Sequence, residues 1–188
     1  MSSDVILVSK RSVLLLLILS LALTAKASYT LTDNDVVMDA NGYIISCSYS
    51  FVDKDIIIPE TLDGVTVKGI GDDYNNLFYN KDITSIQFPS GIEYIGRYGF
   101  AANMLTAIDI QSGLTSISKR AFSSNQLASI TIPGTITSIG EYAFAYNQLT
   151  SVTILDGVIE IGPSAFRSCK ITDITLPNSV VFIREWAF

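Results

Sequence analysis

The side chains that could do chemistry in this sequence are carboxylates and two thiols, because the chain contains no histidine. Without an imidazole, a Ser-His-Asp or Cys-His catalytic arrangement is excluded, and so is a zinc site built on histidine. The two thiols belong to Cys47 and Cys169. Cys47 alternates with serines in a strand-like run, which favours a packed position in a strand over a reactive one.

The carboxylates that could act together occur as three close pairs, Asp33/Asp35, Asp53/Asp55 and Asp72/Asp73. Clustered oxygen ligands can bind Ca²⁺, and two carboxylates across a cleft can hydrolyse a glycoside. The pairs lack the glycine and the distal glutamate of an EF-hand loop, and nothing in the sequence places two of them across a cleft. We therefore expect solvated loop acids, no metal, no cofactor and no catalytic residue. A carboxylate-based hydrolase is the remote alternative.

The elements that position these residues follow a repeat of 22 residues. Phenylalanine recurs at this interval, at Phe78, Phe100, Phe122, Phe144, Phe166 and Phe188. Isoleucine does the same at Ile95, Ile117, Ile139, Ile161 and Ile183. One coil of this length cannot bury its own apolar side chains, whereas stacked coils can. The sequence therefore predicts a solenoid of right-handed coils over residues 83–188, with the last coil incomplete.

Each coil begins with a short strand. In the unit around residue 131, apolar Ile130 and Ile132 flank polar Thr131, which is the alternation of a strand with one buried face. The solvent side of the stacked strands is predicted to carry Ser85, Gln87, Asp109, Ser129, Thr131, Ser151, Thr153, Asp173 and Thr175. This flat, hydroxyl-rich face suits recognition of an extended ligand. The alternative is that short polar side chains simply keep the sheet soluble.

A second extended piece follows in each coil and leads to the buried phenylalanine through what we expect to be a single helical or 3₁₀ turn. Three residues after the phenylalanine, the same interval brings Asn103, Asn125, Asn147 and then Cys169. Burying an amide without partners costs about 1–3 kcal/mol, so we expect these amides to bond to loop backbone. Successive coils stack about 4.8 Å apart, which leaves Cys169 too far from Cys47 for a disulfide.

Both ends of the repeat array are irregular. Residues 28–55 contain an Asn41-Gly42 pair between β-rich runs, which predicts a hairpin that caps the core. Residues 56–82 predict a stretched first coil with an extra turn at 62–65 and a longer loop. That loop carries the candidate binding residues Asp72, Asp73, Tyr74, Asn75 and Asn76. At Phe188 the last coil is left open, so we expect further chain or a partner to cover this end.

The first 27 residues have the features of a secretory signal peptide. Lys10 and Arg11 precede an apolar run at 13–19 that continues to Leu23, and Ala25-Lys26-Ala27 follows. The uncharged stretch is shorter than the ~20 residues that a bilayer requires, so a membrane anchor is the weaker alternative. We expect cleavage after Ala27 and no membrane insertion of the remainder. With a net charge of −6, the chain is unsuited to nucleic acid.

The repeat unit resembles the BspA-type leucine-rich repeat. The matching unit runs from Leu127 to Gln148 and reads LASITIPGTITSIGEYAFAYNQ; the segment from Ile56 to Gly71, IIIPETLDGVTVKGIG, is similar to the opening repeat of that family. The resemblance implies a leucine-rich-repeat solenoid of α/β class, dominated by strands. It also implies a secreted or surface protein without catalytic residues. Many bacterial relatives carry a C-terminal sorting segment that this sequence lacks, so secretion into the medium and retention at the cell surface both stay open.

Taken with the export signal, these features predict an interaction module that binds a protein or glycan through the strand face or the irregular loop. The alternative is a non-catalytic spacer, or an N-terminal fragment of a larger surface protein.

Overall fold

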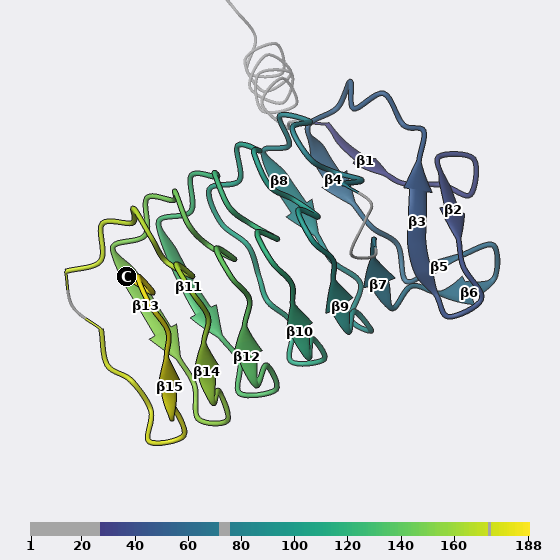
Figure 1. The fold of residues 1–188 in the computed structure, drawn as a ribbon. Coiled ribbons are helices and arrows are strands. Elements are labelled where there is room, and N and C mark those ends of the chain that lie inside the picture. Colours follow the sequence, from purple (N-terminus) through teal and green to yellow (C-terminus); the bar gives the residue numbers. More distant parts are fainter. Residues whose placement is uncertain (1–26, 72–75, 173) are drawn as a thin grey trace, which may run out of the picture.

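A computed structural model describes residues 27–71, 76–172 and 174–188, so the predicted signal segment up to residue 26 lies outside the described residues. Every regular element within these ranges is a strand, and the described part contains no helix that could cross a membrane. The strands are joined by turns into coils that stack along one axis (Figure 1). This is the β-dominated solenoid that the 22-residue period predicts.

The second strand of each coil contributes to one continuous eight-stranded sheet, which we call the long sheet. Its strands are β2 (Val36–Met38), β3 (Tyr43–Cys47), β7 (Gly69–Ile70), β9 (Tyr94–Ile95), β10 (Ser116–Ile117), β12 (Ser138–Ile139), β14 (Glu160–Ile161) and β15 (Phe182–Ile183). The order is β15-β14-β12-β10-β9-β7-β3-β2, and only β2 and β3 are antiparallel. Ile117 pairs with both Ile95 and Ile139, so equivalent residues of successive coils stand side by side.

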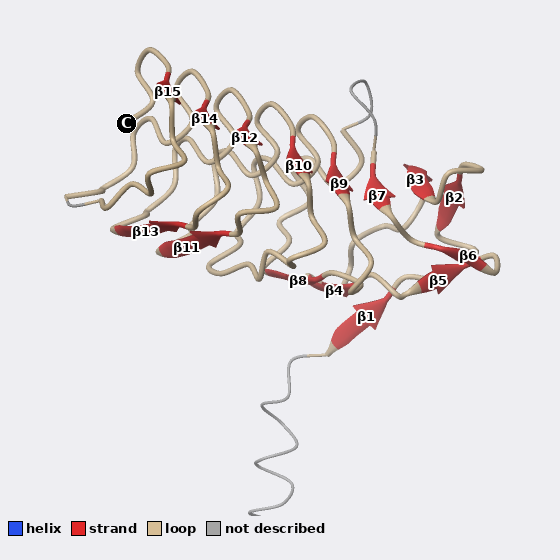
Figure 2. Ribbon diagram, turned by 90° about the horizontal axis from the view of Figure 1, so that it is seen from below, coloured by secondary structure: helices blue, strands red, loops and turns tan. Residues whose placement is uncertain are grey.

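The first strands of the coils lie on the opposite side of the solenoid (Figure 2). One parallel sheet contains β1 (Ser28–Thr30), β4 (Asp55–Ile57) and β8 (Ser85–Gln87), and a second contains β11 (Ser129–Ile132) and β13 (Ser151–Ile154). The coil between β8 and β11 contributes no first strand. The ladder on this side is therefore interrupted, whereas the long sheet is continuous.

An antiparallel pair, β2 and β3, ends the long sheet on the N-terminal side. The turn between the two strands contains the Asn41-Gly42 pair, and Gly42 has a φ of 88°, which favours glycine. Asp39 fixes this turn, because its carboxylate accepts hydrogen bonds from the backbone N–H groups of Asn41 at 2.9 Å and Tyr43 at 2.8 Å. A second hairpin in the irregular coil is made of β5 (Thr61–Leu62) and β6 (Val65–Thr66).

A column of phenylalanine rings runs through the core. Neighbouring rings are stacked with centroids between 5.0 and 5.7 Å apart and planes within 13° of parallel, at Phe78, Phe100, Phe122, Phe144, Phe166 and Phe188. The first five of these side chains are fully buried, whereas Phe188 is 47% exposed at the end of the stack. Each internal ring therefore packs on two others, and the column links every coil to the next.

The turn before each buried phenylalanine is not the helical or 3₁₀ turn that the sequence predicts. From Phe100 onward, the residue two positions earlier has a φ between 54° and 59°, as at Tyr142. A left-handed residue cannot continue a right-handed helix. From Phe78 to Phe166, another left-handed residue follows two positions after the phenylalanine, as at Tyr146. These two reversals turn the chain sharply while the phenylalanine between them points into the core.

The last coil leaves large apolar side chains exposed at the end of the stack. They are Val181, Phe182, Ile183, Trp186 and Phe188. Within the described chain, β15 pairs with β14 on one side only. This end therefore combines an apolar surface with an open strand edge.

Candidate functional site

The strand face is the solvent side of the first strands, and it is the predicted binding surface. The structure exposes the side chains of Ser85, Gln87, Ser129, Thr131, Ser151 and Thr153 on it. The intervening Ile130 and Val152 point into the core, each only 5% exposed. Thr175 is exposed and forms an isolated bridge to Thr153, whereas Asp173 lies outside the described residues. The hydroxyl side chains of neighbouring coils therefore form rows across this face.

Asp109 is exposed, but it does not lie on a strand, and the expectation of one there is wrong. Residues 107–110 belong to no strand, and none of their backbone groups takes part in a backbone hydrogen bond within the described chain. The neighbouring strands β8 and β11 each pair on one side only. The strand face is thus interrupted at this coil.

Phe88 supplies a steric reason for the interruption. Its column in the repeat holds aliphatic residues in the later coils, namely Ile110, Ile132, Ile154 and Leu176. The ring of Phe88 lies edge-on to Phe100 of its own coil, at 5.3 Å between centroids, and to Phe122 of the next, at 6.4 Å. It therefore occupies core space that belongs to the following coil. In that coil Ile110 stays half-buried, whereas Ile132 is fully buried one coil later.

A hollow of about 340 Å³ opens on the strand face beside the interruption. Its lining consists of Ala107, Ile108, Asp109, Ile110, Ser112, Ser129, Ile130, Thr131, Pro133 and Leu155. Aliphatic side chains supply apolar contact area, and the hydroxyls of Ser129 and Thr131 donate or accept hydrogen bonds. On the edge of β11 that faces the hollow, the backbone N–H and C=O groups make no backbone hydrogen bonds to residues 107–110. A concave surface of this size and mixed polarity is suited to holding part of a ligand.

A smaller hollow, of about 220 Å³, lies on the same face toward the C-terminal coils. It is lined by Ser151, Val152, Thr153, Ile174 and Thr175. Three of the predicted face residues, Ser151, Thr153 and Thr175, come together here, while Asp109, Ser129 and Thr131 share the larger hollow. The 22-residue period aligns these residues, but it contains no signal for the hollows themselves.

Four residues of the predicted irregular-loop site, Asp72, Asp73, Tyr74 and Asn75, lie outside the described residues. Asn76 is exposed and precedes the turn that carries Phe78. Binding by this loop stays a prediction.

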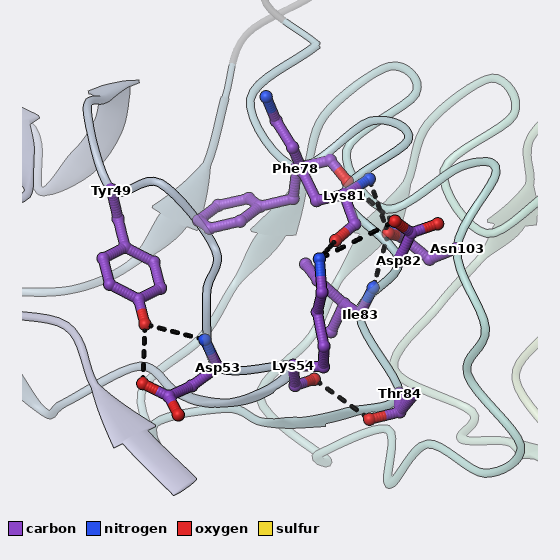
Figure 3. Close-up of polar contacts among 9 residues, drawn as sticks. All are labelled: Tyr49, Asp53, Lys54, Phe78, Lys81, Asp82, Ile83, Thr84 and Asn103. Carbon is purple, nitrogen blue, oxygen red and sulfur yellow. Dashed lines mark hydrogen bonds and ion pairs between the residues drawn. The ribbon is translucent and has the colours of Figure 1, made fainter.

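The asparagine ladder on the turn side is structural, and Asn103 shows how it works (Figure 3). The side-chain amide nitrogen donates to the carbonyls of Phe78 at 2.7 Å and Phe100 at 3.0 Å. The amide oxygen accepts from the backbone N–H groups of Lys81 and Ile83, both at 3.0 Å. The pairing of this buried amide with loop backbone is confirmed.

Asn125 and Asn147 repeat the arrangement one and two coils later. The amide nitrogen of Asn147 donates to the carbonyls of Phe122 at 3.0 Å and Phe144 at 2.9 Å, and its oxygen accepts from the N–H of Leu127 at 3.1 Å. Each asparagine therefore bonds to its own coil and to the preceding one. The ladder joins the turns of adjacent coils, as the long sheet joins their strands.

The two ends of the ladder differ. At the N-terminal end, the ammonium of Lys54 donates to the carbonyl of Lys81 at 2.8 Å and lies 3.7 Å from the carboxylate of Asp82 (Figure 3). Nearby, the hydroxyl of Tyr49 donates to Asp53 at 2.9 Å. The Lys54 contacts tie this segment to the turn that follows Phe78, whereas the Tyr49–Asp53 contact lies within the segment.

At the C-terminal end, Cys169 occupies the asparagine position. Its sulfur lies 3.4 Å from the carbonyl of Phe144, so a thiol of weak hydrogen-bonding capacity replaces the two-sided amide. Burial raises the pKa of the Cys169 thiol, and burial likewise raises the pKa of Cys47. Both cysteines are free. Because a raised pKa keeps these thiols protonated at neutral pH, they are poor nucleophiles.

The described carboxylates of the acidic pairs accept hydrogen bonds from neighbouring groups of the chain, either within one loop or across to the next coil. Asp35 accepts from the hydroxyl of Thr32 at 2.6 Å, and this hydrogen bond holds the pKa of Asp35 below its usual value. Asp55 is buried and accepts from the hydroxyl of Thr84 at 2.9 Å. Within the described ranges, no three acidic or cysteine side chains are close enough together to hold a metal ion. These contacts give the acids local structural roles.

Comparisons with known proteins agree with the repeat geometry. A family model described as "BspA type Leucine rich repeat region" matches residues 74–188 in 6 copies. A leucine-rich repeat protein from Bacteroides ovatus ATCC 8483 superposes with a TM-score of 0.67 at 26% identity, covering 88% of this chain. A leucine rich cell surface protein from Faecalibacterium prausnitzii A2-165 superposes with a TM-score of 0.64 at 29% identity, covering 83%.

The chain spans 43% of the length of each of these two structures. No curated protein matches its sequence. The family model covers more than half of the chain, and its repeats coincide with the coils that carry the phenylalanine column and the asparagine ladder. The chain belongs to the BspA-type leucine-rich repeat family.

Proposed function

We propose that this chain is an exported interaction module that binds a protein or glycan ligand through its strand face, at the cell surface or in the surrounding medium. The observation that carries the proposal is the exposed, hydroxyl-rich strand face with its hollow beside Thr131. The predicted signal segment, and the cell-surface designation of the Faecalibacterium prausnitzii neighbour, support this location. An interaction role without catalysis is in keeping with the carboxylates of Asp35 and Asp55, which accept hydrogen bonds from threonine hydroxyls of the chain itself.

The chemistry of the face favours a largely uncharged ligand. Serine and threonine hydroxyls each donate and accept hydrogen bonds, and their short side chains lose little conformational entropy on binding. The two hollows add apolar contact area from Ile108, Leu155 and Ile174. The excess of acidic residues opposes binding to nucleic acid or to an anionic membrane.

A pair of lysines on the strand face is expected to weaken binding strongly without unfolding the protein. Thr131 and Thr153 are cross-strand neighbours and both are exposed, so the double substitution Thr131→Lys/Thr153→Lys adds bulk and charge where the ligand would lie. We expect affinity for the ligand to fall at least about tenfold. The measurement is biolayer interferometry of the purified chain against a panel of immobilised extracellular-matrix proteins and mucin glycoproteins.

The matched control is Gln126→Lys/Gln148→Lys, which adds the same charge at the same 22-residue spacing on exposed turn-side positions. This control should bind like the wild type. Equal binding by the strand-face variant and the wild type would contradict the proposed surface.

A second candidate function is that of a non-catalytic spacer in a larger surface protein. The observation that favours it is that the chain spans less than half of the two solved neighbours. A stack of coils joined by a continuous sheet is a stiff element that can hold other parts of a protein apart. Absence of any specific partner across the panel would favour the spacer over the interaction module.

We also propose that further chain or a partner covers the open end formed by β15. Its exposed Phe182 and Ile183 would otherwise leave an apolar strand edge in water. The purified chain is therefore expected to self-associate at high concentration, and Phe182→Lys/Ile183→Lys to shift it toward monomer. Sedimentation velocity measures both, and a wild-type chain that stays monomeric throughout would contradict the proposal.

A further inference from the structure

A third hollow lies away from the strand face, in the irregular N-terminal part of the solenoid. It has a volume of about 600 Å³ and opens between the β2–β3 turn, the β5–β6 hairpin and the start of β9. Its polar and aromatic lining comes from Asn41, Tyr43, Thr66, Lys68 and Glu93. This volume is in the range of pockets that hold small ligands.

The walls of the hollow are fixed by backbone hydrogen bonds. The β2–β3 turn is held by the carboxylate of Asp39, which accepts from the N–H groups of Asn41 and Tyr43. The second wall, which contains Thr66 and Lys68, is bonded to this turn, because the N–H of Lys68 donates to the carbonyl of Gly42 at 2.8 Å. The third wall, at Glu93, is bonded to the second, because the N–H of Glu93 donates to the carbonyl of Lys68 at 2.7 Å. The lining is therefore preorganised, which lowers the entropy cost of binding.

Tyr43 places an aromatic ring in the hollow because its strand neighbour is a glycine. Tyr43 pairs with Gly69 across β3 and β7, and Gly69 pairs with Tyr94 across β7 and β9. A methyl group at Gly69 would come within 2.5 Å of the Tyr43 ring, so this ring lies across the glycine. The rings of Tyr43 and Tyr94 are stacked at 5.7 Å with planes 25° apart. The missing side chain at Gly69 creates an aromatic platform.

The polar groups around this platform balance in charge. The ammonium of Lys68 and a carboxylate oxygen of Glu93 are 3.7 Å apart, and the side chains are 48% and 49% exposed. Both keep hydrogen-bonding capacity for a ligand, because an ion pair this exposed is weak. Asn41 and Thr66 add an amide and a hydroxyl. The hollow thus offers donors and acceptors without net charge around one aromatic ring.

We propose that this hollow binds a neutral pyranose sugar of a glycan; the inference rests on the proposed function as an interaction module. One face of a pyranose presents C–H groups that pack on the electron-rich face of an aromatic ring such as Tyr43. The sugar hydroxyls, which both donate and accept, match Asn41, Thr66, Lys68 and Glu93. An acidic sugar is disfavoured by Glu93 and by the negative charge of the chain.

An extended peptide fits the hollow less well than a sugar does. Peptides commonly bind by adding a strand to a free sheet edge. The three strands of the long sheet at the hollow, β3, β7 and β9, are each paired on both sides. They therefore offer no free edge to a peptide. The two-residue strand β6 pairs only with β5 and leaves one short edge at the hollow, which gives a peptide little to pair with, whereas a sugar needs no strand edge.

Isothermal titration calorimetry of the purified chain with neutral tetrasaccharides of glucose, mannose, galactose and N-acetylglucosamine tests the proposal, with a sialylated oligosaccharide as the anionic arm. The wild type should bind at least one neutral probe better than the anionic one. Tyr43→Ala should weaken that binding about tenfold, and Tyr43→Phe should keep it within about twofold. Glu93→Gln should weaken binding, whereas Glu141→Gln, which removes a carboxylate paired with Lys119 elsewhere, should not.

Three results would overturn the proposal: no binding of any neutral tetrasaccharide, preference for the sialylated probe, or unchanged affinity in Tyr43→Ala. Circular dichroism shows whether each variant is folded, and Glu93→Gln provides a surface change that keeps the ring in place. The strand-face variant Thr131→Lys/Thr153→Lys should bind the sugar normally. Loss of sugar binding in the hollow and loss of partner binding on the strand face are thus separate outcomes.

Discussion

Replacing Phe144 with alanine is expected to lower the free energy of unfolding by about 3–5 kcal/mol. The side chain is fully buried, and its ring is stacked between Phe122 at 5.7 Å and Phe166 at 5.6 Å. The substitution leaves a cavity and removes both ring contacts, which no neighbouring coil can restore without shifting its backbone. Chemical denaturation followed by circular dichroism measures the change.

The matched control for this prediction is Phe188→Ala at the end of the same column. Phe188 is 47% exposed and stacks on Phe166 alone among the described rings. Its removal should cost at most about 1 kcal/mol, because less area is buried and only one ring contact is lost. Similar losses at Phe144 and Phe188 would contradict the account of the column.

The substitution Asn147→Ala is expected to destabilise the protein by about 2–4 kcal/mol. Asn147 is 1% exposed, and its amide bonds to carbonyls of two successive coils. Alanine would leave the N–H of Leu127 buried without its acceptor. Because this cost comes from polar groups, it should appear even though the alanine is small enough to fit. Denaturant midpoints of the variant and the wild type provide the test.

Two further variants separate the ladder from general effects of substitution. Gln148→Ala changes the exposed neighbour of Asn147 and should alter stability by no more than about 0.5 kcal/mol. Cys169→Asn supplies the amide that the last ladder position lacks and should stabilise the protein by about 1 kcal/mol. If Asn147→Ala were as mild as Gln148→Ala, the ladder would not hold the coils together.

The parts of the fold that follow the exact period could be predicted from the sequence. Phe144 and Asn147 recur in equivalent positions, so each repeat predicts the environment of the next. Stacking then requires the phenylalanines to meet and the buried asparagines to find backbone partners. The family resemblance rests on the same repeats and is likewise confirmed.

The interruption of the strand face could not be predicted in the same way. Phe88 stands in a column of aliphatic residues, but its bulk acts on the next coil, where the local sequence around Ile108 and Ile110 still reads as a strand. A repeat pattern compares equivalent positions and carries no information on how one side chain displaces its neighbour. The left-handed turns were missed for a related reason, since residues as different as Tyr142 and Ser164 adopt them.

The hollow around Tyr43 lies where the period fails. Its walls come from residues 40–43, from 65–68 and from Glu93, which are close together only because one hairpin precedes the first coil and a second hairpin interrupts it. The useful signal in the sequence was Gly69, whose missing side chain makes room for the tyrosine ring. Without the strand register, that glycine cannot be matched to Tyr43.

We propose that the strand face recognises an extracellular ligand while the phenylalanine column and the asparagine ladder hold the coils in place. The most direct test of this claim is the affinity of the purified chain for its best ligand in the panel, compared between wild type, Thr131→Lys/Thr153→Lys and Gln126→Lys/Gln148→Lys. We predict a loss of at least about tenfold in the strand-face variant alone, with all three chains equally stable. Equal affinity in all three chains would contradict the claim.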